Sequence, residues 1–337
     1  MKIFRNFLFF GLLALSIVSM AFSCKKDKTV ELIGNWVERS DFEGDARSEA
    51  VAFAIGNIGY VGLGYNGDDR LIDFWSYDPD RNNWTQIAEF DSSGRTAAIA
   101  FSAAGKGYVG TGYSGENKMK DFWAYDPVSN TWERKADFGG TARYAAVAFS
   151  IDNIGYVGTG YDGSNLKDIW AYDPGADEWN QKTSYQAKVQ DAVAFVLDGK
   201  GYICTGYNNG EHINDLYMYD PANDIWTAKR KIAPVNANES YDDAYTIIRK
   251  KAVAFVIESN AYIATGNNTS LKNDVWEYDA TTDLWKSRTS FEGTNRNDAV
   301  AFSTEDGRGF VTAGVSGSSH FDDLWEFKPT ETFNQND

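Results

Sequence analysis

The chain has 337 residues, enough for one large domain or two of ordinary size. Its formal net charge is −16 at pH 7, so its surface repels phosphate backbones and nucleic acid is excluded as a partner. Aromatic residues make up 15% of the chain, more than a helical bundle needs.

The N-terminus has the composition of a leader peptide. A basic start precedes the apolar run FLFFGLLALSIVSMAF, which is short for a membrane span. The stretch AFSC that follows resembles the cleavage box of bacterial lipoproteins, in which the cysteine is lipidated. That resemblance implies a leader over 1–23, a lipid on Cys24, a linker over 24–31 and, with Lys25 next, sorting to the outer membrane. A plain secretory signal is the alternative, and it leaves Cys24 unexplained.

Six copies of one pattern fill the rest of the chain. Each copy opens with AVAF or AIAF, continues about ten residues later with GYVG or a variant, and then carries an aspartate before an aromatic pair, as in DFWAYDP. The period is 46–60 residues, which indicates a repeat architecture. The copies open at 50–53, 98–101, 146–149, 192–195, 252–255 and 299–302.

Each copy predicts four short strands. AVAF alternates small and large side chains, turn signals follow it, and no segment has sustained helical periodicity. The sixth copy lacks a closing tryptophan, but GNWVERSDFEGDAR near the N-terminus matches NTWERKADFGGTAR of the second copy. We therefore expect an all-β, six-bladed β-propeller over 32–328, closed by the outer strand of Trp36, with a tail over 329–337.

The stretch GYVGTGY…DFWAYDPVSNTW resembles the kelch repeat. That resemblance implies a propeller of kelch blades, and it covers nearly all of the chain after the leader. The glycines of the first of these motifs, Gly110, Gly112 and Gly115, also have the spacing of a dinucleotide-binding loop, which requires a following helix. Because GYVGTGY recurs at 155–161 and leads to another strand, these glycines are interpreted as packing residues of inner strands.

All 11 tryptophans recur at two repeat positions, so they are interpreted as packing residues and not as sugar platforms. An aspartate also recurs before each third strand, and we expect it to accept backbone N–H bonds from the preceding loop. Calcium binding is the alternative, for which Asp68 and Asp69 beside Asp73 come closest. The recurrent aspartates are Asp73, Asp121, Asp168, Asp215, Asp274 and Asp323.

Binding residues are expected on one face, where the loops from strand 2 to strand 3 and from strand 4 to the next blade meet around the central channel. An arginine stands three residues before the opening alanine in five copies, and Val189 replaces it in the fourth. A ring of arginines favours an anionic ligand, whereas pairing of each arginine with a local carboxylate or carbonyl is the alternative. These arginines are Arg47, Arg95, Arg143, Arg249 and Arg296.

Four tyrosines end second strands at the same rim, where they can either stack on sugar rings or cover the blade ends. They are Tyr65, Tyr113, Tyr161 and Tyr207, and Asn267 and Val315 replace them in the last two copies.

The longest insertion, within KIAPVNANESYDDAYTI, separates the fourth and fifth copies. It is either a specificity loop or a tolerated surface insertion. Its candidate binding residues are Tyr241, Asp242, Asp243 and Tyr245.

Catalytic signals are sparse. His212 and His320 lie in different loops, and Cys204 occupies a strand position otherwise held by glycine, so the copper site of galactose oxidase, a kelch relative, is not expected. No Ser-His-Asp set or zinc spacing is recognisable, and we predict no metal and no cofactor.

The sequence therefore predicts a lipid-anchored envelope propeller that binds a glycan or a partner protein through its loop face. The alternative is a sugar-active enzyme of the sialic-acid mutarotase type, another kelch class, with rim arginines and Glu49 or Glu239 in proton transfer.

Overall fold

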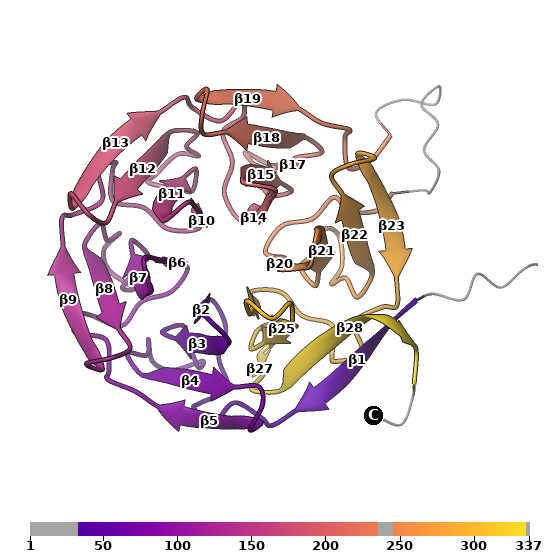
Figure 1. The fold of residues 1–337 in the computed structure, drawn as a ribbon, viewed down its shortest axis with the longest axis horizontal. Coiled ribbons are helices and arrows are strands. Elements are labelled where there is room, and N and C mark those ends of the chain that lie inside the picture. The colour runs from indigo at the N-terminus through magenta and orange to yellow at the C-terminus, as the bar shows by residue number, and fades with distance from the viewer. Residues whose placement is uncertain (1–32, 235–244, 335–337) are drawn as a thin grey trace, which may run out of the picture. The chain divides into compact units, whose positions relative to one another are not determined.

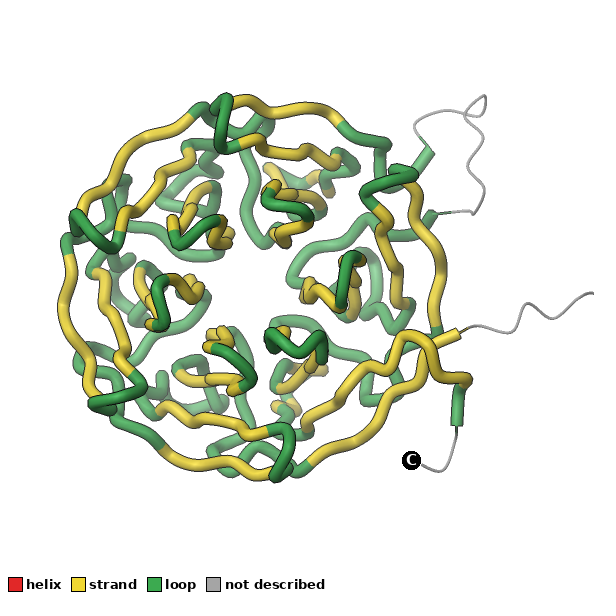
Figure 2. Tube along the Cα trace, in the orientation of Figure 1, coloured by secondary structure: helices red, strands yellow, loops and turns green. Residues whose placement is uncertain are grey.

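The computed structural model describes residues 33–234 and 245–334. Over these residues every regular element is a β-strand and none is a helix (Figure 2). Six four-stranded antiparallel sheets form a ring, which confirms the predicted six-bladed β-propeller (Figure 1).

In the first three blades the four strands follow chain order from the innermost to the outermost. Blade 1 contains β2 (Val51–Ile55), β3 (Ile58–Gly62), β4 (Phe74–Asp78) and β5 (Asn83–Gln86). Blade 2 contains β6 (Ile99–Ala103), β7 (Lys106–Gly110), β8 (Phe122–Asp126) and β9 (Thr131–Lys135). Blade 3 contains β10 (Val147–Ile151), β11 (Ile154–Gly158), β12 (Ile169–Asp173) and β13 (Glu178–Lys182).

The later blades repeat this plan with two additions. Blade 4 contains β14 (Val193–Leu197), β15 (Lys200–Cys204), β18 (Leu216–Asp220) and β19 (Ile225–Ala228). Blade 5 contains β20 (Val253–Ile257), β21 (Asn260–Ala264), β22 (Val275–Asp279) and β23 (Leu284–Arg288). Blade 6 begins with β24 (Val300–Ser303) and β25 (Gly309–Thr312). Two short hairpins that the sequence did not predict extend the loops of blades 4 and 6: β16 (Tyr207–Asn208) with β17 (Glu211–His212), and β26 (Val315–Ser316) with β27 (Ser319–His320).

The ring is closed by pairing between the two ends of the described chain. Strand β1 (Ile33–Arg39) pairs antiparallel with β28 (Leu324–Thr332) and completes blade 6 as its outer strand (Figure 1). Trp36 stands opposite Phe327, as the predicted closure requires. Strand β28 reaches into the stretch assigned to a C-terminal tail, which lengthens the closing ladder.

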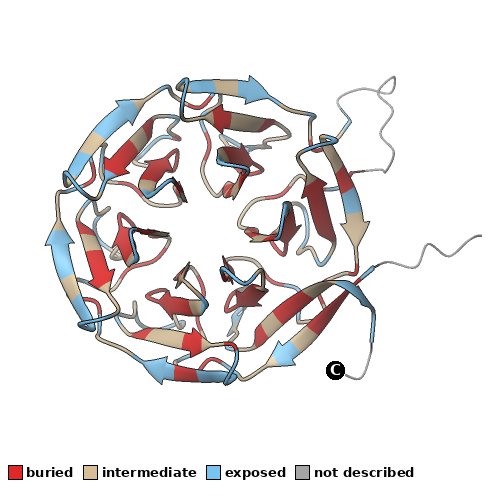
Figure 3. Cartoon of the chain, in the orientation of Figure 1, coloured by how far each residue is buried: buried red, intermediate tan, exposed pale blue. Residues whose placement is uncertain are grey.

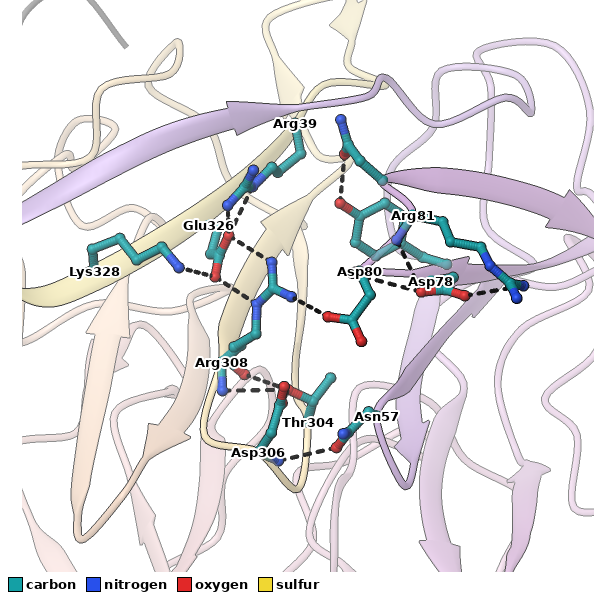
Figure 4. A network of polar contacts seen from close by, with 12 residues as sticks. Arg39, Asn57, Asp78, Asp80, Arg81, Thr304, Asp306, Arg308, Glu326 and Lys328 are labelled. Atoms are coloured by element: carbon teal, nitrogen blue, oxygen red, sulfur yellow. Dashed lines mark hydrogen bonds and ion pairs between the residues drawn. The ribbon is translucent and has the colours of Figure 1, made fainter.

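A buried carboxylate reinforces this closure. Glu326 of β28 is fully buried and pairs with Arg39 of β1, Arg308 and Lys328 (Figure 4). The Nε atoms of Arg39 and Arg308 each lie 2.7 Å from a carboxylate oxygen of Glu326. Burial opposes ionisation of this carboxyl, but the hydrogen bonds from Arg308, Lys328 and Arg39 outweigh it and lower its pKa to about 2. The ionised group therefore holds β1 on the last blade.

Glycines in second strands allow the blades to approach one another. A Cβ atom on Gly107 would lie 2.1 Å from the ring of Phe53 on the preceding blade, and the same overlap recurs at Gly59 and Gly155. The inner-strand phenylalanines therefore pack directly on the neighbouring backbone. Burial follows this arrangement, since the inner strands are mostly buried and the outer strands of blades 1 to 4 are mostly exposed (Figure 3).

Candidate functional site

The five predicted arginines are fully buried and belong to the scaffold. In blade 3, the Nη1 and Nη2 atoms of Arg143 each donate to Asp168 at 2.7 Å, and Nη1 also donates to the carbonyl of Thr159 at 2.9 Å. The Nε atom donates to the carbonyl of Thr141. We call this arrangement the arginine clasp, and it recurs as Arg47–Asp73, Arg95–Asp121 and Arg296–Asp323. The clasp of blade 5 is a variant, in which Arg249 donates from Nη2 to one carboxylate oxygen of Asp274 and from Nη1 to the backbone carbonyl of the same residue.

The clasps correct the prediction of an anion-binding arginine ring. All five arginine residues have 0% exposed surface, so they present nothing to a ligand at the channel mouth. The sequence left two interpretations open, and the structure shows the second: each arginine pairs with a local carboxylate and local carbonyls. The physical reason is that a guanidinium with five donors can bind a carboxylate and two carbonyls at once where two loops meet.

The recurrent aspartates have different partners from those expected. Asp168 accepts from the guanidinium of Arg143 and from the indole Nε1 of Trp170 at 2.8 Å, instead of from the preceding backbone. Burial opposes ionisation of Asp168, but the hydrogen bonds and charge of Arg143 outweigh it and lower its pKa. Within residues 33–234 and 245–334, no group of three or more acidic, histidine or cysteine side chains is arranged to hold a metal.

Blade 4 lacks the clasp. Val189 takes the place of the arginine and is fully buried, and Asp215 pairs instead with Lys231 at 2.7 Å. The side chain of Lys231 is 42% exposed, so this ion pair reaches solvent. The scaffold therefore tolerates an apolar residue at one of its six equivalent positions.

The candidates in the long insertion divide into two groups. Tyr241, Asp242 and Asp243 lie outside the described residues, as does Glu239. Tyr245 is 4% exposed, its ring packs on Trp276, and its hydroxyl accepts from the backbone N–H of Trp285. Tyr245 is therefore a core residue, which corrects its assignment to the binding face. The sequence could not show this, because the burial of Tyr245 depends on strands that are distant along the chain.

The four predicted rim tyrosines are half-buried at the ends of second strands. The hydroxyls of Tyr65 and Tyr113 donate to carbonyls of their own loops, at Gly67 and Gly115. Tyr144, which the sequence analysis missed, lies between Tyr113 and Tyr161, with ring centroids 5.6 Å and 5.5 Å away. The structure thus joins the tyrosines of blades 2 and 3 into one row.

Tyr207 is separate from that row. Its ring contacts His212 at 5.4 Å and lies under the ammonium of Lys250 at 4.3 Å. Burial and the nearby Lys250 lower the pKa of His212, so this imidazole is neutral at pH 7.

The mouth of the central channel is bounded by a closed circle of backbone hydrogen bonds. One residue of each blade donates its N–H to the carbonyl of the equivalent residue in the preceding blade, at 2.9–3.1 Å. All six have left-handed backbone, with φ between +49° and +56°, although none is glycine. We call this set the mouth ring: Glu49, Ala97, Ala145, Asp191, Lys251 and Asp298.

The side chains of the mouth ring differ from blade to blade. Lys251 lies 2.9 Å from Asp298 and 3.3 Å from Glu49. Burial, followed by the charges of Glu49 and Asp191, outweighs the attraction of Lys251 and raises the pKa of Asp298 to about 6. Burial disfavours the charged form of Lys251, but the three acidic neighbours prevail and raise its pKa. The mouth is therefore a coupled, net acidic group of charges.

The mouth has two chemically different parts. Blades 2 and 3 contribute alanines to the ring, and Tyr144 lies close enough to Asp191 and Glu49 for their charges to add to burial in raising its pKa. The other four blades contribute the charged side chains. The ring and the alanines that follow it enclose a cavity of about 150 Å³.

Sequence reasoning missed this ring, apart from the mention of Glu49. A signal was available, because the residue immediately before the opening alanine reads Glu, Ala, Ala, Asp, Lys and Asp in the six copies. The arginine two positions earlier recurs in five copies and was therefore chosen as the candidate instead.

Cys204 is fully buried, and burial raises the pKa of its thiol, as expected for a small core residue. No helix within the described part of the chain has the length and hydropathy to cross a membrane.

The comparisons with known proteins concern the fold. No protein-family model matches the sequence, and no curated protein matches it. The solved structure of YjhT superimposes with a TM-score of 0.69 at 15% identity, over 85% of this chain and 95% of that one. The chain therefore has a six-bladed β-propeller fold similar to that of YjhT.

Proposed function

We propose that this chain is a kelch propeller, anchored by a lipid to the outer membrane of a bacterial envelope, that binds a glycan or a partner protein through its loop face. The mouth ring is the observation that supports this proposal. Its backbone repeats in all six blades, whereas its side chains change from alanine to acid to lysine. Variation on a regular frame is expected where a surface is selected for recognition instead of packing.

The two parts of the mouth suit an amphipathic ligand. The alanines offer an apolar wall, and Lys251, Asp298 and Glu49 offer donors and acceptors on the rest of the ring. Sugar rings have this combination of an apolar face and hydroxyl edges, as do short polar segments of proteins.

A glycan array and a pull-down with the purified protein test this proposal. Replacing Lys251→Gln together with Asp298→Asn removes one ion pair at the mouth while keeping side-chain size. We expect each ligand to bind at least about tenfold more weakly, equivalent to about 1.4 kcal/mol. The matched control is Lys200→Gln with Asp220→Asn, an ion pair at the opposite ends of the blade 4 strands. Unchanged binding of every ligand by the mouth variant would contradict the proposal.

The lipid anchor depends on Cys24, which lies outside the described residues. Cells supplied with a labelled fatty acid should incorporate label into the wild-type protein and not into a Cys24→Ser variant. Equal labelling of both proteins would exclude this anchor.

A sugar-active enzyme of the mutarotase type is the second candidate. What favours it is the position of Asp298 at the mouth cavity, 2.9 Å from Lys251, where burial raises the pKa of this carboxyl to about 6. A carboxyl that titrates near neutral pH can both accept and donate a proton. Following the anomer ratio of acidic sugars by NMR tests this activity. No acceleration by the wild-type protein, or equal acceleration by Asp298→Asn, would exclude Asp298 as the proton-transfer group.

A further inference from the structure

Basic side chains and tyrosines alternate along the loop-face rim of blades 6, 1, 2 and 3. Each basic side chain leans over the strand 2–3 loop of the next blade: Arg70 Nη1 lies 2.6 Å from the position that a Cβ on Gly115 would occupy. The corresponding distances are 3.4 Å for the His320 ring to Gly67 and 4.0 Å for Lys118 Nζ to Gly163. We call these three residues the basic arc, and the order along the rim is His320, Tyr65, Arg70, Tyr113, Lys118 and Tyr161.

Arg70 is held in place by aromatic rings. Its guanidinium carbon lies 5.4 Å from the ring centroid of Tyr65 and 5.5 Å from that of Tyr113. The hydroxyls of both tyrosines bind carbonyls of their own loops, so the rings are fixed before any ligand arrives. The guanidinium is therefore preorganised beside two fixed rings.

The charge of Arg70 has no counter-ion within the described part of the chain. Its Nε atom is buried without a hydrogen-bond partner there, and no ion pair joins Arg70 or Lys118 to a described carboxylate. Asp68 and Asp69 directly precede Arg70 but are exposed and do not pair with it. The five clasp arginines, by contrast, all bind aspartate.

A half-buried, fixed and unpaired guanidinium binds a carboxylate or sulfate strongly, because its desolvation and ordering have already taken place. The rings of Tyr65 and Tyr113 already contact the guanidinium of Arg70, which competes with stacking of bases on them and disfavours single-stranded nucleic acid. The cations Arg70 and Lys118 occupy equivalent positions in successive blades, with the imidazole of His320 at the same position in blade 6. This spacing matches a polymer that carries anions at regular intervals, as polyuronates do.

We propose that the basic arc binds an anionic glycan, with a uronate carboxylate on the edge of Arg70 and neighbouring carboxylates near Lys118 and His320. This inference rests on the proposed function and specifies its ligand class. It also moves anion recognition from the buried arginine ring to the rim.

The test measures binding of a hexameric galacturonate oligomer to the purified protein by calorimetry, beside a neutral hexose oligomer of equal length. We expect the acidic oligomer alone to bind, with a Kd that rises steeply with salt. Arg70→Gln should weaken binding at least about tenfold, and Arg70→Lys should restore it only in part because lysine lacks the planar fork. Lys118→Gln should give a smaller loss. Arg134→Gln, which removes an exposed charge from outer strand β9, is the matched control and should leave the Kd unchanged.

Three results would overturn the proposal: no binding of the acidic oligomer, equal binding of the neutral one, or equal losses in Arg70→Gln and Arg134→Gln. Binding of polyglutamate with the same dependence on Arg70 would also overturn it, since the arc would then recognise carboxylates of any polymer. If the array ligands still depend on Lys251 and Asp298 while these results hold, the proposed function survives and only the arc assignment fails.

Discussion

In five blades a buried arginine binds an aspartate, whereas the residue two positions later in the chain is glutamate, alanine, lysine or aspartate. The clasp and the mouth ring share one loop and one six-fold frame. Clasp side chains repeat because each fills an equivalent interior site that must be electrically satisfied. Mouth-ring side chains border a cavity, so their identity is free to change without loss of packing. Repetition in this protein therefore marks stability, and divergence marks the candidate site.

The largest effect is expected when a clasp is broken. Arg143→Met leaves the Asp168 carboxylate without its counter-ion in a largely buried setting, and it should lower the free energy of unfolding by about 3 kcal/mol or more. Denaturant unfolding measures this. The control is Lys231→Met in blade 4, where the cation is 42% exposed and the loss should stay below about 1 kcal/mol. Equal losses would mean that the clasp is no more important than a surface ion pair.

The second-largest effect is expected at the ring closure, which acid should weaken. The pKa of Glu326 is lowered from 4.5 to about 2, so its contribution of about 3 kcal/mol is complete above pH 4.5 and disappears as the pH falls through 2. Glu326→Gln should remove this pH dependence and destabilise the protein at pH 7. Unfolding curves collected from pH 2 to pH 7 provide the measurement.

The mouth supplies a control of opposite sign. Because the pKa of Asp298 is raised to about 6, its ionisation costs stability as the pH rises from about 4 to 6. Asp298→Asn should flatten the stability curve in that interval and leave the acid limb unchanged. If Glu326→Gln and Asp298→Asn changed the pH dependence of stability in the same way, the opposite pKa shifts of these two carboxyls would be refuted.

A loss of stability of intermediate size is expected when a methyl group is added where the inner strands of two blades pack together. Gly107→Ala places a methyl group 2.1 Å from the Phe53 ring and should cost about 2 kcal/mol. Blade 5 already has Ala261 at the equivalent position, so Ala261→Gly is the matched control and should cost less than about 1 kcal/mol. Thermal unfolding of the two variants distinguishes them; a tolerated alanine at residue 107 would contradict close blade packing.

The smallest effect should have the opposite direction. Ala145 of the mouth ring has φ +53°, a conformation that glycine adopts without strain. Ala145→Gly should therefore be neutral or stabilise the protein by up to about 1 kcal/mol, which denaturant midpoints can resolve. A clear loss of stability would show that the alanine methyl contributes packing at the mouth that outweighs its backbone strain.

Much of the fold could be predicted, because the same strand pattern occurs six times in the sequence. The closure by Trp36 was predictable since the N-terminal stretch carries the missing part of the sixth copy. The site was harder to predict. Arg143 recurs at its position in five copies and Arg70 does not, but recurrence does not say which guanidinium is paired. Only the distances to Asp168 and to the tyrosines separate a satisfied guanidinium from an unpaired one. Tyr245 was misassigned for the same reason, since its burial depends on strands more than 25 residues away.

The sequence by itself determined the number of blades, the order of their strands and the outer strand that closes the ring, because alternation, turn residues and repetition are local properties. Tertiary structure alone decided which charged groups are accessible. Each clasp joins an arginine and an aspartate that lie 25–27 residues apart in one blade, and the mouth ring and the basic arc exist only once the copies have closed around one axis.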